Sequence, residues 1–180
     1  YIERGNPDLN RTQVDNFDVR WEWFVRPGEL LSASVFYKDF TNPIERTIDP
    51  EAAANQEITY VNRSSARVYG VELEVQKRLD GLASWLRHVQ VGGNLTLTES
   101  QVSRPDDVLQ AIRAFDVNAD DTRPLQGQSP YIVNLNAGYE NPTTGTSINV
   151  FYNRFGDRLD TVTRNGVDLY EQGRSMLDVN

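Results

Sequence analysis

The chain has 180 residues, 38% of them hydrophobic and 24% charged, so it is long enough for one domain and is not low in complexity. Its formal net charge of −8 argues against a nucleic-acid partner, because phosphate binding requires a basic surface. Cysteine is absent, which excludes disulfides and thiolate sites, and no apolar run of about 18 residues predicts a transmembrane helix.

The first strong pattern is VDNFDVRWEWFVR at residues 14–26, in which apolar and polar side chains alternate. This period of two predicts a β-strand with one apolar face and one polar face. Pro27 and Gly28 then predict a tight turn, after which a second strand runs back over residues 30–40. A polar connection follows at 41–57, and a third strand is expected from about 58 to 79.

The second half of the chain repeats the pattern. Further strands, the last of them incomplete, are expected at residues 88–100, 130–140, 147–156 and 174–180. Between the first two of these lies a long connection, 101–129, which contains DDVLQAIRAF at 106–115. The apolar residues of this segment have helical spacing, so it predicts one short amphipathic helix.

The connections alternate in length along the chain. Short ones are expected at 26–29, 80–87 and 141–146, and long ones at 41–57, 101–129 and 157–173. In an antiparallel meander successive connections lie at opposite ends, so all the short ones share one end of the sheet. This asymmetry is typical of outer-membrane barrels, whose strands need about 9–11 residues to cross the apolar band. A soluble sandwich or barrel, closed on itself, stays open as the alternative fold.

Strand motifs along nearly the whole chain resemble those of TonB-dependent outer-membrane receptors. They lie at residues 5–23 (GNPDLNRTQVDNFDVRWEW), 34–44, 61–79 (VNRSSARVYGVELEVQKRL), 125–140 and 148–159. The resemblance implies an all-β fold, an antiparallel meander of about six to seven long strands from a barrel of about 22 strands. Residues 1–180 would then be a single partial β-barrel domain without the plug domain or the TonB box. We therefore expect the chain to be a fragment of a longer protein.

Receptors of this family bind a scarce ligand, such as a siderophore, cobalamin, haem or a glycan, and import it with TonB-coupled energy. The resemblance implies this role for the parent protein in the bacterial cell outer membrane. Its partners would be outer-membrane lipid, the imported small ligand or glycan and, through the missing N-terminal region, TonB. The isolated fragment is expected to self-associate through its unpaired strand edges. The alternative function is a soluble all-β binding module.

The family's orientation assigns the two faces of the strands. The apolar face would contact lipid and consists of Phe17, Val19, Trp21, Trp23, Tyr69, Val71, Leu73, Val75, Leu95, Leu97, Val133 and Leu135. The polar face would line the lumen and consists of Arg20, Glu22, Glu72, Glu74, Gln90, Asn94, Thr96, Asn134 and Asn136. In the long connection, Arg104, Arg113 and Arg123 are candidates for contact with an anionic ligand.

Neither a cofactor nor a catalytic residue is predicted. His88 has no paired nucleophile in the sequence, and Glu72 and Glu74 alternate as acids commonly do on a solvated strand face. The chain is therefore not expected to be an enzyme.

Asp116, Asn118 and Asp120 begin like a Ca²⁺ loop, with oxygens at its first, third and fifth positions. The glycine and glutamate expected later in such a loop are replaced by Asp121 and Gly127. These three residues are therefore an incomplete candidate metal site.

Overall fold

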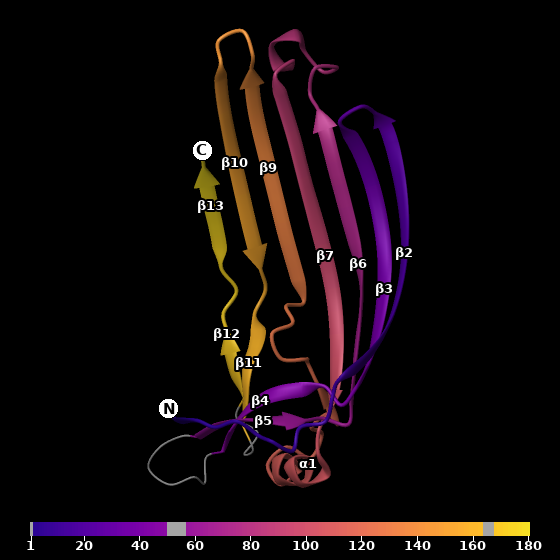
Figure 1. Ribbon diagram of the computed structural model, residues 1–180, viewed down its shortest axis with the longest axis vertical. Helices are drawn as coiled ribbons and strands as arrows, with labels where there is room; N and C mark the ends of the chain where they lie inside the picture. Colours follow the sequence, from indigo (N-terminus) through magenta and orange to yellow (C-terminus); the bar gives the residue numbers. More distant parts are fainter. Residues whose placement is uncertain (1, 50–56, 164–167) are drawn as a thin grey trace.

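The computed structural model describes residues 2–49, 57–163 and 168–180, which form a tall curved sheet and a smaller sheet at one end of it (Figure 1). The strands of the tall sheet are β2 (Gln13–Arg26), β3 (Glu29–Thr41), β6 (Ser65–Arg78), β7 (Val89–Ser103), β8 (Thr122–Arg123), β9 (Tyr131–Asn141), β10 (Thr146–Phe155) and β13 (Ser175–Val179). They follow the order β13-β10-β9-β7-β6-β3-β2, with β8 paired to β7. Every neighbouring pair is antiparallel, so the predicted all-β meander is confirmed.

The tall sheet is open, and β2 and β13 are its edge strands in the described part of the chain. A sandwich or barrel closed on itself is therefore not the observed arrangement. Register keeps like beside like across the sheet, because Val35 pairs with Val71 and Val71 with Leu97, while Ser34 pairs with Glu72. Such cross-strand pairs fix which side chains share a face.

The three short connections lie together at one end of the tall sheet, at the top of Figure 1. In the first, Gly28 has φ of 82°, and in the third Gly145 has φ of 69°, a backbone conformation that glycine adopts without steric cost. The second, between β6 and β7, contains the 3₁₀-helix η1 (Ser84–Leu86). We call this end of the sheet the turn end.

The opposite end, which we call the loop end, carries the long connections and the smaller sheet (Figure 1). The strands of the smaller sheet are β1 (Ile2–Glu3), β5 (Glu57–Asn62), β4 (Ile44–Asp49), β11 (Arg158–Thr163) and β12 (Leu169–Glu171), in that order. The predicted amphipathic helix is present as α1 (Asp106–Arg113), also at the loop end. None of the described helices is long and apolar enough to cross a membrane.

The prediction of one strand from 58 to 79 was wrong. The chain leaves the smaller sheet after β5 and enters the tall sheet at β6, with a break at Arg63 and Ser64. Side-chain hydrogen bonds hold this break, because Asn62 Nδ2 donates to the backbone carbonyls of Asn10 and Asn42 at 2.9 and 2.8 Å. The connections 41–57 and 157–173, expected to be loops, also contain strands, namely β4, β11 and β12.

The buried apolar side chains gather at the loop end rather than along the middle of the tall sheet. They are Ile48, Ile58, Ala66, Val68, Val102, Leu109, Phe155, Leu159 and Val162. Over most of its height the tall sheet is therefore a single layer with two accessible faces.

Candidate functional site

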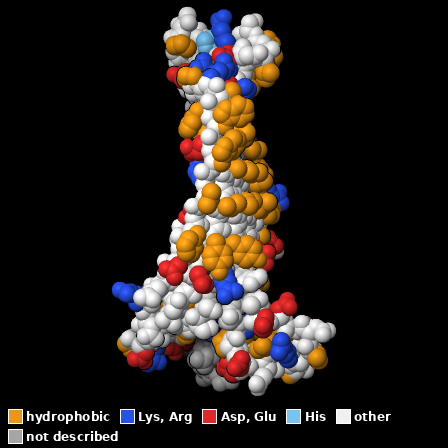
Figure 2. Space-filling model, turned by 90° about the vertical axis from the view of Figure 1, so that its right-hand side faces the viewer, with side chains coloured by type: hydrophobic (Ala, Val, Ile, Leu, Met, Phe, Trp, Pro, Cys, Tyr) orange, Lys and Arg blue, Asp and Glu red, His pale blue; other side chains and the backbone are white. Residues whose placement is uncertain are grey.

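One face of the tall sheet is a continuous apolar surface. Its register places Phe17 beside Tyr37 and Tyr69, and aligns the apolar residues of the other strands in the same way. Every residue predicted to contact lipid lies on this face. The side chains are well exposed, with 54% for Trp21 and 51% for Leu135. Figure 2, seen from the β2 side, shows hydrophobic side chains in a stripe along the tall sheet.

Charged side chains bound this apolar surface along the strands. Towards the loop end, Asp39, Arg67 and Glu99 follow the last apolar residues on the same face, and Arg67 lies 3.8 Å from Asp39. Towards the turn end Lys77 follows Val75 and pairs with Glu29 at 3.0 Å. A band of apolar side chains between two charged borders is the arrangement that spans a lipid hydrocarbon layer.

The opposite face is polar and carries the residues predicted to line the lumen. Around Glu74, Arg20 donates at 2.9 Å, Gln76 at 3.1 Å and Ser32 at 3.5 Å. Arg20 also pairs with Glu22 at 2.6 Å. These hydrogen bonds join β2, β3 and β6, so the polar face is tied together by side chains as well as by the backbone.

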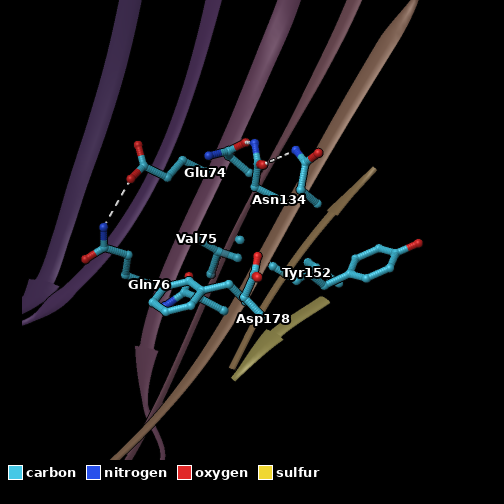
Figure 3. Close-up of a pocket in the computed structure, with 12 residues that line it drawn as sticks. Glu74, Val75, Gln76, Asn134, Tyr152 and Asp178 are labelled. Carbon is cyan, nitrogen blue, oxygen red and sulfur yellow. Dashed lines mark hydrogen bonds between the residues drawn. The ribbon is translucent and has the colours of Figure 1, made fainter. Parts of the chain in front are cut away.

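An asparagine ladder continues this network across β7, β9 and β10. Asn134 Nδ2 donates to Asn94 Oδ1 at 2.8 Å, and Asn153 Nδ2 donates to Asn134 Oδ1 at 2.6 Å. The ladder borders a shallow cavity of about 240 Å³ whose other polar lining residues include Glu74 and Asp178 (Figure 3). This lumen-face cavity presents amides and carboxylates, groups that hold a polar partner by hydrogen bonds.

A second cavity, of about 240 Å³, lies at the loop end, and we call it the loop cavity. It is lined by Thr47, Val61, Arg63, Arg104, Pro105, Asp107, Val108, Arg123, Val162 and Thr163. All three long connections contribute to this lining, although they are far apart in the sequence. The three connections predicted to carry ligand contacts therefore meet at one place.

The structure separates the three arginines named from the sequence. Arg123 is buried and donates from both terminal nitrogens to Glu45, whose side chain is fully buried. Arg104 lines the loop cavity and lies 3.7 Å from Asp168. Arg113 lies outside the cavity lining and donates from Nε and Nη2 to the Ala119 carbonyl, both at 3.2 Å.

Two residues of this cluster were missed by sequence reasoning. Arg63 lines the loop cavity and donates from Nε to Glu45 at 2.8 Å, so Glu45 receives two arginines. The pairs are separated by 18 and 78 positions, and no local pattern reports a contact over such distances. The only available signal was a charged residue in each of two connections.

The candidate metal loop forms a turn through its own first residue. Asp116 Oδ1 accepts a hydrogen bond from the backbone N–H of Asn118 at 3.1 Å. Within residues 2–49, 57–163 and 168–180, no group of three or more His, Cys, Asp or Glu side chains is arranged to hold a metal ion. His88 accepts a hydrogen bond from Arg87 Nε at 2.9 Å and lies edge-on to Tyr139, with ring centroids 6.0 Å apart.

Several solved structures share this fold. The FrpB iron transporter of Neisseria meningitidis (F3-3 variant) is similar over 99% of the chain and 24% of its own, with a TM-score of 0.58 and 11% identity. The copper transporter OprC is similar over 98% of the chain and 25% of its own, with a TM-score of 0.63 and 14% identity. The siderophore receptor PirA of Acinetobacter baumannii gives 98%, 26%, 0.58 and 14% for the same quantities.

The chain thus spans about a quarter of the length of the solved structures that it matches. A search of curated proteins finds no significant match. The family model described as TonB dependent receptor-like, beta-barrel, matches residues 1–179. Proteins of this family are transporters of the outer membrane of Gram-negative bacteria. The chain therefore belongs to the TonB-dependent receptor β-barrel family and is part of an outer-membrane receptor.

Proposed function

We propose that the chain forms part of the barrel wall of a receptor that binds a scarce ligand and imports it with energy coupled through TonB. The supporting observation is the two-faced sheet, with an apolar band on one face, a hydrogen-bonded polar network on the other and all long connections at one end. In this proposal residues 1–180 are one partial barrel domain. The plug and the region that contacts TonB belong to other parts of the receptor.

The proposed orientation gives each face one environment. The apolar face contacts lipid, and the polar face lines the lumen. The turn end then lies on the periplasmic side and the loop end on the extracellular side, as in other barrels of the outer membrane. The arrangement suits this assignment because the apolar side chains are exposed between charged borders, and the polar side chains satisfy one another by hydrogen bonds.

Spin labels on neighbouring residues test this orientation. Leu73→Cys and Glu72→Cys are prepared separately in the full-length receptor with any other reactive cysteine removed, labelled with a nitroxide and reconstituted in lipid vesicles. The label at position 73 should collide readily with oxygen, which concentrates in hydrocarbon. The label at position 72 should show less oxygen contact and more contact with a water-soluble nickel chelate. Equal accessibility at the two positions, or the reverse order, contradicts the assignment.

The imported ligand is proposed to be a siderophore, cobalamin, haem or a glycan. Similar folds are carried by proteins named as iron, siderophore and copper transporters or receptors. Growth that depends on each compound is compared in the parent strain, in a strain without the receptor and in a strain without TonB. At least one compound should support growth only when both proteins are present. If all three strains grow equally on every compound, the import role fails.

A further inference from the structure

The loop cavity contains an arginine that lacks a hydrogen-bond acceptor. The Arg104 side chain is 18% exposed, and its buried Nε has no hydrogen-bond partner among the described residues. Its Nη1 lies 3.7 Å from Asp168 Oδ2, which is too long for a hydrogen bond. A buried donor without an acceptor costs free energy, so an acceptor that enters the cavity is favoured at this position.

Two further guanidinium groups border the same cavity. Arg123 is held by Glu45, which fixes its position in the wall. Arg63 donates to Glu45 from Nε, and its terminal nitrogens have no recorded hydrogen-bond partner within the described part of the chain. The described lining thus contains three arginines and one acid, Asp107. The donors that face the cavity exceed the acceptors available to them.

We propose that the loop cavity binds an oxyanion, a phosphate or a carboxylate group, through Arg104 and Arg63. Guanidinium groups are planar donors whose geometry matches two oxygens of such a group. A cavity of about 240 Å³ is smaller than the usual pocket for a whole drug-sized ligand, so it takes a charged terminal group rather than an entire molecule. Arg123 contributes positive charge behind the bound group.

The identity of the carrier is separate from the existence of the site. If the imported ligand carries the oxyanion, the inference rests on the proposed receptor function and narrows the ligand to an anionic compound. An anionic lipid headgroup offers the same chemistry from the membrane. The site itself is argued from the loop cavity, the buried Arg104 donor and the excess of arginines.

The test is binding of inorganic phosphate to the full-length receptor, purified in detergent and titrated in phosphate-free buffer by calorimetry. Arg104→Gln should weaken binding at least about tenfold, because it removes a hydrogen bond to a charged group. Arg104→Lys should give an intermediate affinity, because it keeps the charge and loses the planar fork. The matched control is Arg113→Gln in the same connection, which should bind like the unmodified receptor.

A second arm uses vesicles of phosphatidylcholine with and without phosphatidic acid. Preference for phosphatidic acid that is lost in Arg104→Gln identifies a lipid headgroup as the carrier, whereas binding of free phosphate alone identifies a soluble anion. The proposal is overturned if the receptor binds neither probe, or if Arg113→Gln loses as much affinity as Arg104→Gln. Heat-modifiable electrophoretic mobility establishes that each variant is folded. TonB-dependent growth without phosphate binding would overturn the oxyanion site and leave the receptor function intact.

Discussion

Glu45 is the residue on which the loop end depends most directly. Its carboxylate is fully buried and neutralises Arg123 and Arg63 together. We expect Glu45→Gln to lower the free energy of unfolding by about 3–5 kcal/mol, because it leaves a buried arginine without its counter-charge. Denaturant unfolding of the full-length receptor measures this, with Glu57→Gln as the control. Glu57 pairs at 3.5 Å with an exposed arginine, so its loss should cost less than about 1 kcal/mol.

Gly70 lies where two elements approach most closely on the polar face. A side-chain carbon at this position would lie 2.6 Å from Phe36 Cζ and would also meet the backbone carbonyl of Leu97. Because a backbone atom cannot move aside cheaply, Gly70→Ala should cost about 1–3 kcal/mol of stability. Thermal unfolding in detergent measures the change. Gly5→Ala has no atom within 4 Å of the added carbon, and a similar loss in both variants would argue against the close-approach explanation.

Asp80 gives the turn end a dependence on pH. The hydrogen bond from the Arg26 guanidinium holds the pKa of the Asp80 carboxyl below its ordinary value. A depressed pKa means that the stabilisation is present above the ordinary value of 3.8 and is lost as pH falls through the folded-state pKa. In Arg26→Gln the titration of Asp80, followed by the carboxyl carbon NMR signal, should move to higher pH. An unchanged midpoint would show that Arg26 is not the cause.

At the residue scale, the sequence predicted faces better than contacts. A period of two is enough to place Val71 and Glu72 on opposite sides of a strand, and the observed register agrees. The pairing of Glu45 with Arg123 joins residues 78 positions apart, so no periodicity encodes it. For the same reason Arg63 was not recognised as part of the candidate site.

At the scale of elements, the long strands were predicted because each alternates over ten residues or more. The short strands β4, β5, β11 and β12 were not separated from loops, because six or fewer residues carry too little pattern. Their partners are also remote, since β4 pairs in parallel with β11 through Thr47 and Val162. Non-local pairing of this kind leaves no trace in the local sequence.

Strand β6 allows a direct test of its two faces with one kind of substitution. Leu73→Lys places a charge on the apolar face and should cost about 2–4 kcal/mol if that face meets the middle of the bilayer. Glu72→Lys, one position away on the polar face, should cost much less because its side chain keeps polar surroundings. The folded fraction of the full-length receptor in lipid vesicles over a urea series measures both. Equal losses would contradict a lipid environment restricted to one face.

At the scale of the whole molecule, the tall sheet has two exposed edges and one exposed apolar face. Each of these surfaces favours association with another chain. The 180-residue polypeptide expressed alone should therefore form dimers or larger species in detergent-free buffer. Size-exclusion chromatography with light scattering determines the mass. A stable monomer that keeps Trp21 and Trp23 exposed would contradict this expectation.

The pairing of β4 with β11 has a mechanical consequence. These strands follow β3 and β10, which are separated by β6, β7 and β9 in the tall sheet. Thr47 Oγ1 reinforces the join by donating to the Val162 carbonyl at 3.1 Å in a buried position. The join acts as a strap across the arc of strands, so the rim at this end cannot widen without breaking buried hydrogen bonds. Any molecule that enters there meets an aperture of set width, while the unstrapped opposite rim keeps the freedom to flex.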